Sequence, residues 1–160
     1  MIEATNAGGI MTTRAELSAA EEYGHGHTRL MRAALDGNTE RVEELIHQGA
    51  DINQRDDNGR TALMFAVINT HYETMKVLLE YGADVNAKSN EGGTALMGAA
   101  LVGDLRMVQA LLDKGADLHA RLLETNESAV TFAASHGYDE IARLLSQVDW
   151  EPLQRPPRGD

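Results

Sequence analysis

Residues 61–86 read TALMFAVINTHYETMKVLLEYGADVN, and residues 94–119 read TALMGAALVGDLRMVQALLDKGADLH. The second stretch begins 33 residues after the first, and the same frame occurs upstream, where Thr28 opens TRLMRAA. Downstream, Ser128 opens SAVTFAA after an interval of 34 residues. The chain therefore contains four copies of one short structural unit, and a period of this length is typical of repeat architectures.

Each copy has the pattern of two short helices. In the third copy, Thr94 is a suitable N-cap for an alanine-rich helix, and Gly103 can take the left-handed conformation that ends it. Asp104 would cap a second helix with a single apolar face, and Gly115 would end that helix. The polar stretch that follows suits an extended, hairpin-like loop. We expect such units to stack, because neighbouring units can then share one continuous core.

This pattern resembles the ankyrin repeat, which has a 33-residue period and a T-P-L-H-x-A segment near its first helix. The resemblance covers about residues 27–148. It implies an all-α solenoid of stacked helix–turn–helix units with short hairpin loops.

The resemblance also divides the chain. It implies an ankyrin domain over residues 24–150, with repeats that begin near 24, 57, 90 and 123. Residues 1–23 would form an N-terminal extension with a short helix in it, and Met11 is an alternative start to Met1. The segment EPLQRPPRGD at 151–160 holds all three prolines of the chain, so we expect a disordered tail there.

Two features depart from the family pattern. Met31, Met64 and Met97 stand in phase where the family has histidine. We expect them to form an apolar ladder inside the stack, and the alternative is an adaptable binding surface. Thr70 stands where the family has a glycine, and a left-handed β-branched residue costs about 1–2 kcal/mol. We therefore expect a rebuilt turn in which Asn69 takes the positive φ.

The first and last units should act as caps, because the ends of an array need a polar outer side. Arg29 and Arg32 of the first unit are expected to face water. The loop before the last unit is one residue longer than the others, and we expect its Leu122 and Leu123 to pack against that unit.

Composition limits the function classes. Acidic residues outnumber basic ones by 25 to 14, which gives a formal charge of −11. Such a surface repels nucleic acid and anionic membranes and favours a basic partner. No apolar stretch approaches the length of a membrane helix. The chain has no cysteine, which excludes thiol chemistry and suits a reducing compartment. We expect a monomer in the cytoplasm.

The sequence gives no indication of an enzyme. The six histidines are scattered, and none belongs to a known nucleophile or metal motif. The pair in GHGH at 24–27 has no third ligand nearby. We therefore expect no enzymatic activity, no metal and no cofactor.

Binding is expected in the concave groove of the array. In ankyrin repeats, the hairpin tips and the ends of the first helices face this groove. Carried over unit by unit, the resemblance implies partner contacts from Leu35, Asp36, Asp57, Asn58, Arg60, Ile68, Asn69, Asn90, Glu91, Leu101, Val102, Ser135 and His136.

Four of these residues are apolar where solvent would suit polar ones: Leu35, Ile68, Leu101 and Val102. An exposed apolar patch usually marks a partner site. With Asp57 and Glu91 at its rim, the groove would suit a protein segment that has an apolar centre and basic flanks.

Two other functions stay open. A small acidic array could be a stand-alone inhibitor or immunity-type protein of one enzyme. The segments that end in Asn53 and Asn86 are similar to ankyrin segments that an asparaginyl hydroxylase modifies. Alternatively, these asparagines simply stabilise the turns in which they lie.

Overall fold

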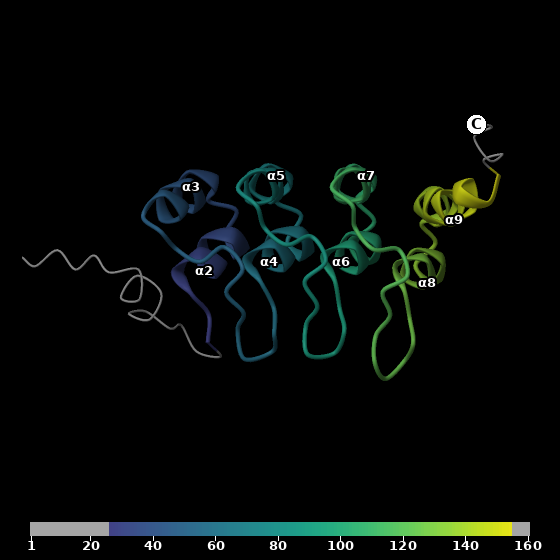
Figure 1. Cartoon of the computed structure of the whole chain (residues 1–160), viewed down its shortest axis with the longest axis horizontal. Coiled ribbons are helices and arrows are strands. Elements are labelled where there is room, and N and C mark those ends of the chain that lie inside the picture. Colours follow the sequence, from purple (N-terminus) through teal and green to yellow (C-terminus); the bar gives the residue numbers. More distant parts are fainter. Residues whose placement is uncertain (1–25, 155–160) are drawn as a thin grey trace, which may run out of the picture.

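The computed structural model describes residues 26–154, with side chains described through residue 147. This part of the chain forms eight helices and no strand. The helices lie in two rows (Figure 1). The inner row comprises α2 (Arg29–Leu35), α4 (Ala62–Ile68), α6 (Ala95–Val102) and α8 (Ala129–Ser135). The outer row comprises α3 (Thr39–His47), α5 (Tyr72–Glu80), α7 (Leu105–Asp113) and α9 (Asp139–Gln154).

The stacking follows the order of the sequence. Each inner helix contacts the outer helix that comes next in the chain, and each helix contacts its neighbours in its own row. Units far apart along the chain do not pack on one another, and the array is therefore elongated (Figure 1). This arrangement confirms the predicted all-α repeat fold.

The inner helices begin at the expected residues. The hydroxyls of Thr28 and Thr94 accept hydrogen bonds from the amides of Met31 and Met97, at 3.2 and 3.3 Å. Thr61 precedes α4 in the same extended conformation, but its buried hydroxyl has no hydrogen-bond partner among the described residues. Helices α4 and α6 therefore begin at equivalent positions, one unit apart, as a repeat requires.

The turn between the two helices of a unit needs one residue with positive φ. After α6 this residue is Gly103, with φ 76°. After α4 it is Thr70, with φ 60°, whereas Asn69 has φ −96°. The prediction of a positive φ at Asn69 is therefore wrong. The turn keeps the common geometry because the amide of His71 bonds to the carbonyl of Ala66 at 2.9 Å, and Thr70 must then take the left-handed conformation.

The core between the rows consists of small and aliphatic side chains. Ala34, Ala66, Ala99 and Ala133 are fully buried, and their size allows neighbouring inner helices to approach closely. Longer side chains from the outer row, such as Leu78, fill the space between the rows. The buried alanines thus lie where neighbouring units meet, as expected for a repeat array.

The methionine ladder is only partly present. Met31 and Met97 are 1% and 4% exposed, which confirms their predicted place in the core. Met64 is only half-buried, and the prediction is wrong for this residue. Its side chain borders a surface hollow that Gly98 of the next inner helix also lines, and a glycine has no side chain to cover it.

Three loops connect consecutive units and project beyond the inner row, over residues 52–60, 85–93 and 118–127 (Figure 1). Each is closed by a backbone hydrogen bond of the hairpin type. The donor and acceptor pairs are Asp56 and Arg60 at 2.9 Å, Ser89 and Gly93 at 2.8 Å, and Leu122 and Glu127 at 2.9 Å.

Neighbouring loops are also bonded to each other. The amide of Asn90 donates to the carbonyl of Asn58, and the amide of Leu123 donates to the carbonyl of Glu91, both at 2.9 Å. The three loops therefore form one continuous wall beside the inner row.

The two ends of the array differ from the middle. Arg32 has a side chain that is 55% exposed, as expected for a terminal unit. Leu122 packs against the core, but Leu123 is 75% exposed, and the prediction that both leucines pack is wrong for Leu123. Leu123 stands at the tip of a longer loop, where only the neighbouring loop is within reach.

Helix α9 is longer than the other helices of the outer row and ends at Gln154. The tail expected to be disordered from 151 therefore starts with helical residues. The helix continues through Pro152 although proline lacks the amide hydrogen that would bond to the preceding turn, so this end of α9 has one backbone hydrogen bond fewer. The expectations for residues 1–23 and 155–160 lie outside the described residues.

Candidate functional site

The surface that we call the groove is formed by the inner row and the three loops. It contains all of the residues that the sequence predicts to bind a partner. Ile68, at the end of α4, is 42% exposed, which is unusual for a large apolar side chain in this array. Leu35, Leu101 and Val102 are half-buried, and none of the four is fully enclosed.

These apolar residues contribute unequally to the core. Leu35 packs against the buried cluster from its edge. Ile68 extends from the last turn of α4, and Leu101 and Val102 form the last turn of α6. These three residues thus place apolar side chains at the ends of the two middle inner helices.

Beside Ile68 the groove has a hollow of about 200 Å³. Its exposed lining is mostly apolar. The residues that line the hollow are Arg60, Met64, Phe65, Ile68, Ser89, Gly93, Thr94, Ala95 and Gly98. It therefore lies where α4 and α6 meet the first and second loops.

The hollow was not predicted, although the sequence contains a signal for it. Counted from the Thr or Ser that opens each unit, the fifth position holds Arg32, Phe65, Gly98 and Phe132. This position lies on the groove side of the inner row. The third unit thus lacks the large side chain that its two neighbours have, and space remains between them.

Arg60 and Asp56 form the corner next to the hollow. The Asp56 carboxylate is fully buried, and it accepts hydrogen bonds from the backbone amide and the Nε of Arg60 at 2.7 and 2.9 Å. The guanidinium of Arg60 lies over the Phe65 ring, 4.8 Å from its centroid. His27 packs edge-on against the same ring at 4.9 Å. Arg60 therefore orders the first loop as well as facing the groove.

Several other predicted contact residues also hold the scaffold. The Asn90 side chain donates to the carbonyl of Asp57 at 2.8 Å, which links two loops. Asn69 donates to the carbonyl of Phe65 at 2.9 Å and so closes the end of α4. Asn90 and Asn69 therefore have structural roles, whereas Ile68 lies outside the buried core.

The predicted residues at the two ends of the groove are polar. Asp36 forms an exposed ion pair with Arg32 at 3.1 Å. Ser135 and His136 are exposed at the end of α8, where the His136 ring stacks on Tyr138 with centroids 6.3 Å apart. Ile68, Leu101 and Val102 therefore lie between these polar residues.

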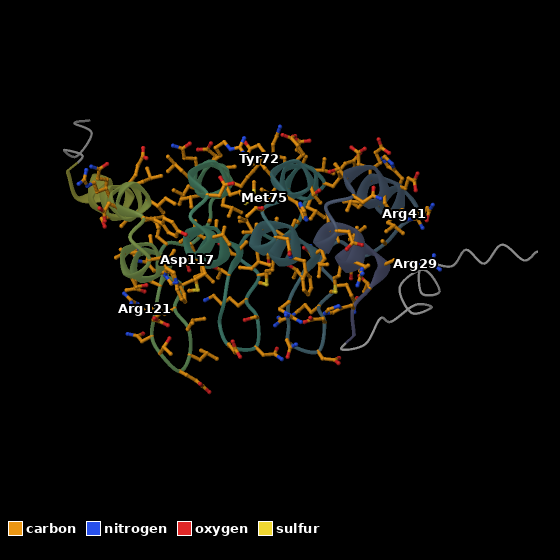
Figure 2. The ribbon with its side chains drawn as sticks, turned by 180° about the vertical axis from the view of Figure 1, so that it is seen from behind. Arg29, Arg41, Tyr72, Met75, Asp117 and Arg121 are labelled. Carbon is orange, nitrogen blue, oxygen red and sulfur yellow. The ribbon has the colours of Figure 1, made fainter. Side chains whose placement is uncertain are left out.

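Charge is distributed unevenly between the two sides of the array. The inner row and the three loops carry six cationic and five anionic residues. The rest of the part with described side chains carries five cationic and thirteen anionic residues, and all of these except Asp36 at the end of α2 lie on the outer row and its turns. Figure 2 shows Arg41 on the outer row and Arg121 at the opposite edge, on a loop. The acidic surplus thus lies away from the groove.

Asp57 and Glu91 are exposed on the first and second loops, as expected. However, Arg55 and Lys88 on the same loops balance their charge. The guanidinium of Arg55 also bonds to the carbonyl of Lys88 at 2.7 Å, which adds a further link between the loops.

A family model for ankyrin repeats in three copies matches residues 30–122 and 87–155. The chain belongs to the ankyrin-repeat family. No curated protein matches the chain. Ankyrin repeats are generally modules for protein–protein interaction, and the family is typically non-enzymatic.

The ankyrin array shows two further features that bear on function. None of its described helices is long and apolar enough to cross a membrane. Its described histidine and acidic side chains do not gather in groups of three or more that could hold a metal ion. The groove is therefore the surface on which a functional proposal can be built.

Proposed function

We propose that this chain binds a partner protein through the middle of the groove, over α4 and α6 and the first two loops. The observation that carries the proposal is the exposed Ile68 beside an apolar hollow. Apolar surface of this kind is costly in water and is usually kept because a partner covers it. Covering the exposed part of Ile68, a residue that is 42% exposed, contributes about 1 kcal/mol.

The proposal separates binding from folding. Ile68 does not belong to the buried core, and Leu101 is only half-buried. The stability of the array rests on the buried alanines and leucines between the units. Ile68 and Leu101 can therefore change without unfolding the array.

The same reasoning bears on the chemistry of the partner. A segment with basic flanks would meet Asp57 and Glu91 at the rim, but Arg55 and Lys88 offset this attraction. Apolar contact therefore supplies most of the affinity, and charge contributes little in the groove. We further infer a cytoplasmic location, since the chain contains no cysteine that would suit an oxidising compartment, and we take a monomer as the working state.

The experiment is affinity capture of partners from the native host with the full chain, followed by mass spectrometry. In parallel, the capture is repeated with a variant that carries Ile68→Asp and Leu101→Asp. We expect the variant to lose the partner, because two carboxylates in the apolar centre would each be desolvated on binding. Its melting temperature should stay close to that of the wild type.

A matched control carries Gln109→Asp and Ser146→Asp, at two exposed positions of the outer row. It has the same added charge and should retain the partner. The proposal fails if the control loses the partner as well, or if the groove variant retains it.

The capture also distinguishes the two kinds of binder. One enzyme recovered in equal molar amount would indicate an inhibitor, whereas several unrelated proteins would indicate an adaptor. Intact mass of the native chain would reveal hydroxylation of Asn53 or Asn86 as a gain of one oxygen atom.

A further inference from the structure

We propose that the hollow between α4 and α6 receives one uncharged aromatic side chain of the partner. This inference rests on the proposed function and makes it specific, because it assigns a residue class to one place in the groove. Four observations support it: the missing side chain at Gly98, the apolar lining, the guanidinium of Arg60 and the thioether of Met64.

Gly98 is the origin of the hollow. The equivalent residues of the second and fourth units are Phe65 and Phe132, so the backbone geometry of a unit accepts a phenylalanine at this position. Gly98 lies inside α6 and has no positive φ that would require glycine. A Cβ placed on it would meet only Val67, at 3.4 Å. Since glycine inside a helix costs about 1 kcal/mol relative to alanine, a function for the space would explain its presence.

The hollow has a suitable size for an aromatic ring. Its volume is about 200 Å³, and apolar cavities of about 150 Å³ bind benzene in other proteins. Ala95 and Gly98 form one wall without bulky side chains, and Phe65 and Ile68 form the other. A ring placed there would be covered on both sides by apolar atoms.

Two residues at the hollow favour an aromatic over an aliphatic occupant. The Arg60 guanidinium lies over Phe65, and its side chain is still 39% exposed, so a second ring can stack on it. Met64 is half-buried at the same hollow, and thioethers make favourable contacts with aromatic rings. An aliphatic side chain would gain binding free energy from burial alone, without these two contacts.

Charge argues for an uncharged occupant. Arg60 is the only charged residue in the lining of this hollow, and a lysine or arginine would be repelled by it. A carboxylate would compete with Asp56, which already accepts a hydrogen bond from the Nε of the Arg60 guanidinium. The surrounding loops are close to neutral.

The test uses N-acetyl-tryptophanamide as the probe, with N-acetyl-leucinamide as its aliphatic counterpart. Each is titrated into the full chain with labelled methyl groups, and the methyl signals are followed by NMR. We expect saturable shifts at Met64 and Ile68 with a dissociation constant on the order of 1–10 mM for the tryptophan probe. The leucine probe should bind several-fold more weakly, and Val77 and Leu112 of the outer row should not shift.

The decisive variant is Gly98→Phe, which restores the residue that two other units have and fills the hollow. We expect it to weaken binding of the tryptophan probe by about tenfold or more. Gly98→Ala should have an intermediate effect and should melt no lower than the wild type, because it improves helix propensity. If Gly98→Phe proves unstable, the partial loss of affinity for the tryptophan probe in Gly98→Ala still tests the inference.

Several results would overturn the inference. Unchanged binding in both Gly98 variants, or equal binding of the two probes, would show that the hollow does not select an aromatic side chain. Shifts at Met64 and Ile68 that depend on protein concentration would indicate a second copy of the chain as occupant.

These outcomes are distinct from failure of the proposed function. If the probe does not bind but the Ile68 and Leu101 variant still loses the captured partner, the groove binds a protein without an aromatic anchor. If the probe binds but the variant with Ile68→Asp and Leu101→Asp retains the partner, the hollow binds an aromatic group and the proposed function is wrong.

Discussion

The side-chain oxygen of Asn86 accepts a hydrogen bond from the backbone amide of Asp117 at 2.8 Å, one unit further along the chain. Asn53 makes the same contact with Asp84, also at 2.8 Å. Asn86 additionally donates to the carbonyl of Gly115 at 3.0 Å. These asparagines therefore join the turns that follow the outer helices, which is the structural role that the sequence left open for them.

Replacing Asn86 by alanine should lower the free energy of unfolding by about 1 kcal/mol, because two exposed hydrogen bonds between units are lost. Asn53→Ala should have a smaller effect, since Asn53 makes only the bond to Asp84 through its side-chain oxygen. Urea denaturation followed by circular dichroism measures both values. Equal stability of Asn86→Ala and the wild type would contradict this role.

Thr70 stores backbone strain that can be released. Its φ of 60° is unfavourable for a β-branched residue, by about 1–2 kcal/mol. Thr70→Gly removes this strain but makes the unfolded chain more flexible, which offsets part of the gain. We expect a net stabilisation of about 0.5–1 kcal/mol in thermal or chemical denaturation.

Gly103, at the equivalent turn of the third unit, allows the opposite substitution, from glycine to a residue with a side chain. A Cβ added there would clash with the Tyr138 ring, in addition to the strain of φ 76°. Gly103→Ala should therefore destabilise the array by more than about 1 kcal/mol. If Thr70→Gly lowers stability instead, the side chain of Thr70 has a favourable role that its exposed position does not suggest.

Asp56 should be the most sensitive residue of the first loop. Its buried carboxylate accepts hydrogen bonds from the amide of Asn58 at 3.0 Å and from Arg60 at two atoms. Asp56→Ala should cost about 2–4 kcal/mol, because it leaves these donors without their acceptor. Asp56→Asn keeps one acceptor oxygen and should cost less. A loss below about 0.5 kcal/mol in Asp56→Ala, measured by urea denaturation, would show that the loop is not held by this carboxylate.

The repeat fold could be predicted from the sequence because its determinants are local and recur. Backbone chemistry within one unit accounts for Thr94 as an N-cap, for Gly103 as a turn residue and for the spacing from Thr61. The conformation of Thr70 could not be predicted in this way. There the packing of two helices overrides the preference of a β-branched residue for negative φ. The larger of these two effects can be identified only in the structure of the whole unit.

The groove could be predicted less completely than the fold. The exposure of Ile68 follows from its place in the repeat. The hollow depends instead on the absence of a side chain at Gly98, a position that holds phenylalanine in the units on either side. The position of the acidic charge also required the structure, since the total of −11 does not reveal which side carries it. Comparing equivalent positions across units, as for Phe65 and Gly98, is the step that would have revealed the hollow.

Hydrogen exchange of the full chain, with and without the captured partner, tests the central claim most directly. The account predicts that bound partner slows exchange in α4, α6 and the loops at 52–60 and 85–93, while α3, α5 and α7 exchange as in the free chain. Protection that is confined to the outer row would contradict the account, because the partner would then lie on the acidic side of the array.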